Sequence, residues 1–230
     1  MSNFYLNKIF IEARYNSALY FNDMDKLQSI IDKTSKYFSL NNYDTNTKTL
    51  ILINQKEHLN VNISDKRFII DMDEPKAFEE FGEVSNDIIK SITETLSISK
   101  LTRIGMRSFV GIYKKNYGAA DNYVRRNFIK IDDKSFSILG RNIRDIGVSF
   151  SFNCEDYKIL MNIKPNTLKI TEIENNTVKR NETKYQVLID SDVFEDGNIE
   201  ADKLCKDFIK DVIKINNENI NNFIRDVSIY

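Results

Sequence analysis

The stretch LTRIGMRSFVGIYKKNYGAADNYVRRNFIK, residues 101–130, differs in composition from the chain around it. Five of the chain's seven glycines lie in or just after it: Gly105, Gly111, Gly118, Gly140 and Gly147. Between Lys100 and Arg144 eleven basic residues stand against three acidic ones, which gives this window a net charge of +8. The whole chain carries −1, so the remainder carries −9. The sequence therefore has a basic centre, residues 100–144, within acidic surroundings.

Hydrophobic periodicity predicts the elements on both sides of this centre. The first fourteen residues of the quoted stretch alternate like a strand, and 119–129 has the spacing of a short helix. Before it we expect a strand at 6–15, a helix from Met24 with Asn22 or Asp23 as N-cap, strands at 49–54, 59–64 and 67–72, and a helix at 78–96. After it we expect strands at 146–153, 157–163, 167–175 and 184–191, and a closing helix at 204–227.

The same order of elements occurs twice, which predicts an internal duplication. IIDMDEP (69–75) followed by NDIIKSI (86–92) aligns with LIDSDVF (188–194) followed by KDFIKDV (206–212). We therefore expect an α+β protein with two strand–helix–three-or-four-strand–helix repeats, 1–99 and 100–230, joined without a linker. This order resembles the TATA-binding-protein-like fold, which implies one curved antiparallel sheet with helices on one face.

Composition places the chain among folded globular proteins, since 41% of its residues are apolar and 11% are aromatic. The N-terminal residues lack the basic and apolar regions of a signal peptide. No run of eighteen apolar residues occurs, so no membrane span is expected. Cys154 and Cys205 are expected to be reduced thiols, because no secretion signal accompanies them. We expect a cytoplasmic location.

Two interpretations of Arg103, Gly105 and Arg107 are open. Period-two geometry places all three on one face of a strand. A glycine between two arginines leaves a shallow gap that a ligand or another backbone could approach. Alternatively, Gly105 relieves a bend in the sheet, and both arginines are solvated or paired with carboxylates.

The segment RIGMR, residues 103–107, resembles a motif found in a group of bacterial proteins of unknown function. These proteins are distributed sporadically and carry an Arg-Ile-Gly-aliphatic-Arg segment near mid-chain. The similarity would cover the chain from about Leu50 to the last helix. The motif continues with an aromatic residue after the second arginine, whereas here Ser108 takes that place and Phe109 follows. The resemblance implies no assigned activity, and its sporadic distribution suggests phage-defence or toxin–antitoxin loci.

No local motif predicts catalysis. Asp71 with Asp73, and Asp190 with Asp192, could hold a hard cation, but their expected position at strand ends is explained by turn chemistry alone. His58, the only histidine, is expected in an exposed turn. Glycine-rich nucleotide-binding loops and Cys-x-x-Cys spacings do not occur. We therefore expect no enzyme, no metal and no cofactor.

The basic centre is the best candidate for a binding site. The residues expected to bind an acidic surface or phosphate groups are Arg103, Arg107, Lys114, Lys115, Arg125 and Arg126. Aromatic residues between them could stack on bases. Because the remainder of the chain is acidic, we expect a non-catalytic binding module for a protein partner. The alternative is a nucleic-acid-binding regulator that uses residues 100–144. A homodimer that pairs acidic and basic ends is a further possibility.

Overall fold

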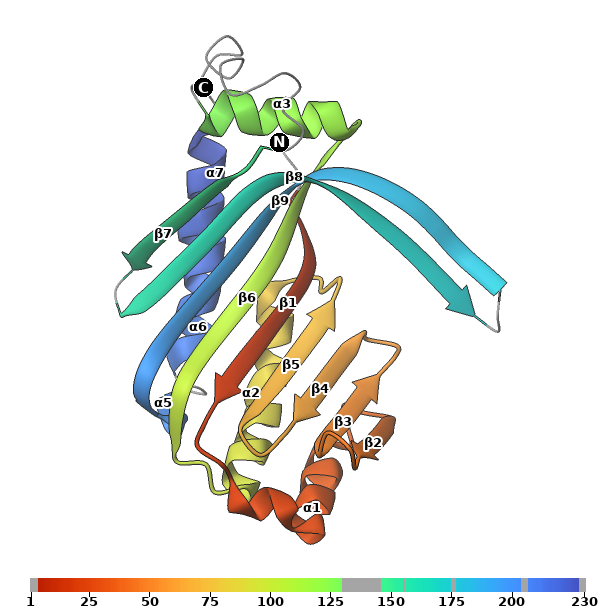
Figure 1. The fold of residues 1–230 in the computed structure, drawn as a ribbon, viewed down its shortest axis with the longest axis vertical. Coiled ribbons are helices and arrows are strands. Elements are labelled where there is room, and N and C mark those ends of the chain that lie inside the picture. The colour runs from red at the N-terminus through yellow and green to blue at the C-terminus, as the bar shows by residue number, and fades with distance from the viewer. Residues whose placement is uncertain (1–3, 130–145, 155, 175–176, 204–206, 228–230) are drawn as a thin grey trace.

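A computed structural model of the chain describes residues 4–129, 146–154, 156–174, 177–203 and 207–227 (Figure 1). The strands are β1 (Phe4–Arg14), β2 (Leu40–Asp44), β3 (Thr49–Asn54), β4 (Leu59–Ile63), β5 (Arg67–Asp73), β6 (Lys100–Lys114), β7 (Val148–Cys154), β8 (Tyr157–Glu174) and β9 (Thr177–Glu200). The helices are η1 (Leu19–Asn22), α1 (Met24–Thr34), α2 (Phe78–Thr95), α3 (Tyr117–Phe128), α5 (Ala201–Lys203), α6 (Ile209–Lys214), the π-helix η3 (Ile215–Ile220) and α7 (Asn221–Val227).

All nine strands form one antiparallel sheet in the order β2-β3-β4-β5-β1-β6-β9-β8-β7. One of the central strands is β6, which forms the first part of the basic centre. It pairs with β1 on one side, where Ile9 lies opposite Ser108, and with β9 on the other, where Arg107 lies opposite Asp192. The two halves of the chain therefore share one continuous ladder of backbone hydrogen bonds.

The prediction of a duplicated unit with helices on one face, in the TATA-binding-protein-like order, is wrong. The chain forms a single nine-stranded sheet, and its second half does not repeat the first. The two strands expected at 157–163 and 167–175 are one 18-residue strand, β8, and β9 is 24 residues long. The helices do not form one layer either: α2, α6 and α7 lie behind the sheet, whereas α3 crosses its end (Figure 1). The division of the chain into 1–99 and 100–230, as parts of one continuous unit without a linker, stays a prediction.

β8 was predicted as two shorter strands on either side of Pro165, because a proline is expected to interrupt a paired strand. The partner β7 begins at Val148, opposite Ile163, so among the described strands β8 pairs with β9 alone from Pro165 onwards. A proline is tolerated at such an edge, where its missing N–H leaves no ladder bond unmade. Beyond Thr167 the two strands run on as a two-stranded arm that bends away from the sheet (Figure 1).

Most other elements were predicted within a few residues of their observed ends. α1 begins at Met24, and its N-cap is Asp23, whose side chain accepts a hydrogen bond from the Asp25 amide. β3 matches its predicted range, while β2 was missed because its sequence, LNNYD, is polar and mostly exposed. Of the closing helix predicted at 204–227, residues 204–206 lie outside the described ranges, and the rest includes α6, α7 and the π-helical turn η3, which periodicity did not predict.

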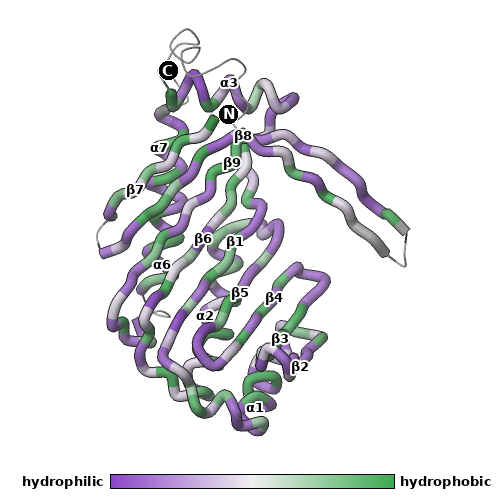
Figure 2. Tube along the Cα trace, viewed as in Figure 1, coloured by the Kyte–Doolittle hydropathy of each residue, from purple (hydrophilic) through white to green (hydrophobic). Residues whose placement is uncertain are grey.

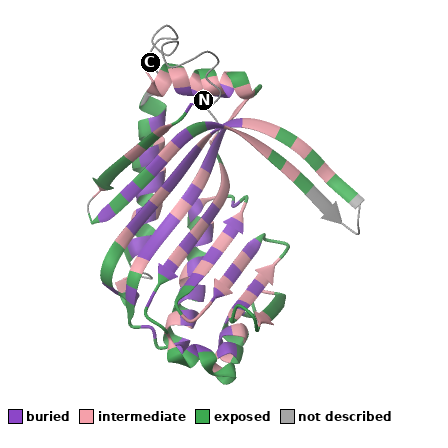
Figure 3. Ribbon diagram, in the orientation of Figure 1, coloured by how far each residue is buried: buried purple, intermediate pink, exposed green. Residues whose placement is uncertain are grey.

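Apolar side chains on one face of the sheet form the core with α2, α6 and α7. Along the central strands, alternate residues are fully buried on this face, as Ile9, Ile11, Ile104 and Met106 illustrate. Figure 2 shows the alternation of hydropathy along the strands, and Figure 3 shows that burial follows it through the sheet. The spacing of two residues per repeat therefore decides which side chains enter the core.

Gly111 of β6 is required by a polar bridge that crosses the strand. A β-bulge at Asn7 shifts the β1–β6 register, and the Asn7 amide donates to Gln186 Oε1 of β9 over a distance of 3.0 Å. A Cβ on Gly111 would overlap Gln186 Oε1 and lie 3.0 Å from Asn7 Nδ2. Since Gln186 is buried, displacing it would leave polar atoms without partners.

We predict that Gly111→Ala lowers the free energy of unfolding by about 1 to 2 kcal/mol, because it breaks the Asn7–Gln186 hydrogen bond. Urea denaturation followed by circular dichroism measures the change. The matched control is Gly118→Ala in α3, where the nearest atom, Asn116 Oδ1, would lie 3.5 Å from the new Cβ. The control is expected to leave stability unchanged or to raise it by up to about 1 kcal/mol. Equal stabilities of wild type and Gly111→Ala would contradict the role of the bridge.

Candidate functional site

The sheet face opposite the core, here called the open face, carries most of the charged side chains of the central strands. Opposite residues of antiparallel strands point to the same side, so the registers define its members. They are Lys8, Phe10, Glu12, Arg14, Arg67, Ile69, Asp71, Asp73, Arg103, Gly105, Arg107, Phe109, Lys158, Leu160, Asn162, Asp190, Asp192, Phe194 and Asp196. Six of these are basic and six are acidic.

Arg107 makes a two-pronged ion pair with the neighbouring strand. Its Nε and one terminal nitrogen donate to the two carboxylate oxygens of Asp190, each over 2.7 Å. These hydrogen bonds raise the pKa of the Arg107 guanidinium. Its guanidinium also lies 5.2 Å from the ring centre of Phe109. Such a geometry fixes the side chain in place more firmly than a single charge contact does.

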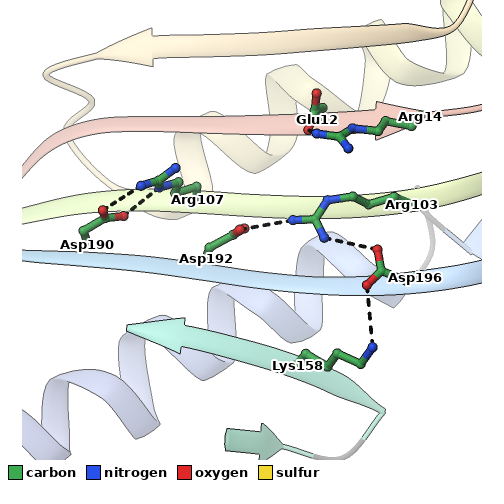
Figure 4. A network of polar contacts seen from close by, with 8 residues as sticks. All are labelled: Glu12, Arg14, Arg103, Arg107, Lys158, Asp190, Asp192 and Asp196. Carbon is green, nitrogen blue, oxygen red and sulfur yellow. Dashed lines mark hydrogen bonds and ion pairs between the residues drawn. The ribbon is translucent and has the colours of Figure 1, made fainter. Parts of the chain in front are cut away.

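Arg103 lies between two carboxylates of β9, as Figure 4 shows. It donates to Asp192 and to Asp196, both over 3.1 Å, and Asp196 is also 3.6 Å from Lys158 Nζ. The guanidinium stacks on the ring of Phe194 at 4.0 Å.

The gap at Gly105 is filled from within the protein. Phe194 lies directly opposite Gly105 in the β6–β9 register and is only 8% exposed. A Cβ at Gly105 would lie 3.2 Å from Phe194 Cβ and 3.3 Å from Asp192 Oδ1. Of the two interpretations offered for Arg103, Gly105 and Arg107, the geometry therefore matches the one in which both arginines pair with carboxylates.

Asp192 is the carboxylate of this network whose charged form is disfavoured by burial. Burial raises the pKa of its carboxyl above 3.8, and the nearby Asp190 and Glu12 charges act in the same direction. Arg103 and Arg107 lower this pKa but do not offset the loss of hydration.

The remaining acidic residues of the open face are also paired. Lys8 Nζ lies 2.7 Å from Asp71 and 3.0 Å from Asp73, and Glu12 contacts both Arg14 and Arg67. Two pairs of carboxylates, Asp71 with Asp73 and Asp190 with Asp192, were predicted to lie at strand ends. This prediction is wrong for Asp190 and Asp192, which lie within β9. Among the described residues, no group of three or more His, Cys, Asp or Glu side chains is arranged to hold a metal ion.

The structure divides the six predicted binding residues into two groups. Arg103 and Arg107 lie on the open face, whereas Lys114 is at the far end of β6, about 23 Å along the strand from Arg107. Lys115 follows β6, and Arg125 and Arg126 belong to α3. Arg125 pairs with Asp121 at 2.6 Å. Lys114 Nζ lies 3.9 Å from the ring centre of Tyr123, and burial lowers the pKa of its ammonium group.

Other candidate residues have plain structural positions. His58 is exposed in the turn between β3 and β4, with a φ of 51°. Cys154 is a free cysteine at the end of β7. Cys205 and the basic residues of 130–144, including Lys130, Arg141 and Arg144, lie outside the described residues. Within the described part of the chain, no helix is long and apolar enough to cross a membrane.

Comparison with known proteins adds no relative: no protein-family model matches the chain, and no curated protein matches it. The resemblance carried by residues 103–107, and the phage-defence or toxin–antitoxin role that it implies, stay predictions.

We predict that Asp192→Asn and Asp190→Asn differ in their effects on stability. Asp192 titrates with a raised pKa in the folded state, so the folded protein binds more protons than the unfolded chain between 3.8 and that raised value. Wild-type stability contributed by this group therefore falls as pH rises through the window. Asp192→Asn lacks this penalty, so its stability relative to wild type should increase as the pH rises from 3.8 through the raised pKa of Asp192.

Asp190→Asn is the matched comparison, because it removes one oxygen from the two-pronged pair with Arg107. It is expected to lower the free energy of unfolding by about 1 to 2 kcal/mol at neutral pH. Urea denaturation at several pH values measures both variants. A stability difference between Asp192→Asn and wild type that shrinks with rising pH would contradict the assignment.

Proposed function

We propose that the chain is a non-catalytic binding module whose open face contacts a protein partner. The observation that carries this proposal is the balance of charge on that face. Its six basic side chains are matched by six acidic ones, and the contacts between them cross strand boundaries. A surface that carries both positive and negative side chains at fixed positions can bind a protein surface whose charges are arranged in the complementary way.

Nucleic acid is a poorer match for the same face. Binding to a phosphate backbone depends on cations that neutralise phosphates and release counterions. Arg103 and Arg107 already contact Asp190, Asp192 and Asp196. A phosphate chain would have to displace these carboxylates and would then face their repulsion.

Apolar side chains lie among the charges of the open face. Leu160 is 42% exposed, and Phe10, Ile69 and Phe109 are each partly exposed. A hollow of about 690 Å³ lies at one side of this face, lined by residues that include Ile51, Arg67 and Ile69. Apolar contacts surrounded by polar groups are typical of protein–protein interfaces.

One observation favours the alternative of a nucleic-acid-binding regulator. Lys115 and Arg126 are exposed, and they lie near the end of the sheet where α3 crosses it, away from the acidic residues of the open face. Exposed cations of this kind can contact phosphates without reading bases.

We predict that Leu160→Asp abolishes retention of the partner. The tagged protein is used to capture partners from the native host, with and without nuclease, and the retained proteins are identified by mass spectrometry. A new carboxylate on the open face would be desolvated in the complex, which should weaken binding roughly tenfold or more. Leu19→Asp, at a position that is 81% exposed in η1, is the matched control and should retain the partner.

The two functions separate in the same experiment. A protein retained by wild type and Leu19→Asp, indifferent to nuclease and lost in Leu160→Asp, supports the module. Nucleic acid retained by both Asp variants and lost in a Lys115→Glu, Arg126→Glu double variant would replace it with the regulator.

A further inference from the structure

In the described part of the chain β7 is an outer strand of the sheet, and its own sequence has none of the features that usually protect such an edge. Among the described strands, only β8 pairs with it, and its seven residues, VSFSFNC, include no charged residue and no proline. Proteins usually guard such edges with lysine, proline, a bulge or a very short strand, because an open edge pairs with other chains.

The opposite edge of the same sheet is guarded. β2 is only five residues long, and its residues Leu40–Asp44 include a carboxylate and two asparagines. Asp44 is held in the adjoining turn by hydrogen bonds from Asn46 and Thr47. Of the two outer strands, β7 is therefore the one whose sequence lacks these protective features, whereas β2 has them.

An apolar surface adjoins the bare edge on the core side of the sheet. Phe150 and Phe152 alternate along β7, and Phe150 packs edge-on against Phe223 of α7 with 5.8 Å between ring centres. Phe152 is 41% exposed and Phe223 is 37% exposed. Together with Met161, Asn219 and Ile220 they line a hollow of about 280 Å³. Partly exposed aromatic rings around an apolar hollow are the kind of surface that a contact with another protein covers.

We propose that the β7 edges of two copies of this chain pair in antiparallel fashion about a two-fold axis through Ser151. The sheets of both copies then join into one sheet of eighteen strands. With Ser151 opposite Ser151 of the second copy, all seven residues of β7 find a partner, and Phe150 lies opposite Phe152 of the second copy on the core side. Each exposed ring thereby gains an aromatic neighbour across the new ladder.

A second copy fits this edge because the edge is complementary to itself. A two-fold interface places the same strand on both sides, so any charge near the axis would face its own copy. β7 carries no charged side chain, and Ser149, Ser151 and Asn153, which alternate with its two phenylalanines, are small and polar. The dimer uses the backbone edge of β7 and its core-side rings, whereas Ser149, Ser151 and Asn153 adjoin the open face, opposite Asn162, Leu160 and Lys158. The dimer goes beyond the binding function proposed above, and neither proposal requires the other.

We predict that Ser151→Cys forms an intermolecular disulfide under mild oxidation. The experiment uses a background in which Cys154 and Cys205 are both serine. Residues on the axis have Cα atoms about 4.5 to 5.5 Å apart, which a disulfide can span. The control, Ser149→Cys, places the two thiols about 13 Å apart along the strands and should not cross-link. Non-reducing gels measure the fraction of dimer in both variants. Equal cross-linking of the two variants, or none in Ser151→Cys, would overturn the proposed register.

We also predict that Ser151→Lys and Ser151→Asp are each monomeric alone and dimerise when mixed. Like charges facing each other on the axis should weaken the homodimer about tenfold or more, whereas the mixed pair has opposite charges. Ser151 is exposed, so neither change disturbs the core. Analytical ultracentrifugation of wild type, each variant and the mixture gives the association constants. A wild type that stays monomeric at all concentrations, or a mixture no more associated than either variant, would refute the dimer.

Discussion

The pairing of β6 along both of its edges is the constraint on which the rest of this structure depends. Its fifteen residues hydrogen-bond to β1 on one side and to β9 on the other, so the first and last strands of the chain are held by the middle one. Because side chains alternate strictly along a strand, this ladder also decides what each face carries. Ile104, Met106 and Ser108 enter the core, while Arg103, Gly105 and Arg107 face outward.

The ion pairs of the open face contribute more to shape than to stability. Partly buried charges lose hydration, and the attraction of their partners need not offset that loss, as the raised pKa of Asp192 illustrates. What the pairs do provide is fixed geometry. The two-pronged contact between Arg107 and Asp190, and the stacking of Arg103 on Phe194, hold charges at set positions on a broad surface. A partner that matches these positions meets a surface that needs little rearrangement, so less conformational entropy is lost on binding.

Sequence reasoning located most elements but not their assembly. Periodicity is a local signal, so it found β6 and α2 and placed Arg103, Gly105 and Arg107 on one face, while capping chemistry narrowed the N-cap of α1 to Asn22 or Asp23. The partners of these residues lie more than eighty positions away on β9, and no local pattern reveals which carboxylate faces which arginine. Similar acidic segments at 69–75 and 188–194 suggested a repeat, although Asp190 and Asp192 lie in the middle of a long strand. Pro165 suggested a break because its edge position depends on where β7 begins, which the sequence does not show.

The position of β1 also bears on how the chain folds as it is made. Residues 4–95 supply β1 to β5 with α1 and α2, so five neighbouring strands of the sheet can assemble before β6 has been synthesised. During that interval β1, the future neighbour of β6, is an outer strand of the partial sheet. At usual rates of synthesis the forty-odd residues between the end of β5 and the end of β6 take a few seconds. Over those seconds the ribosome-bound chain displays a long unpaired edge, and a chaperone that shields β1 would protect the nascent protein from pairing with its neighbours on the same polysome.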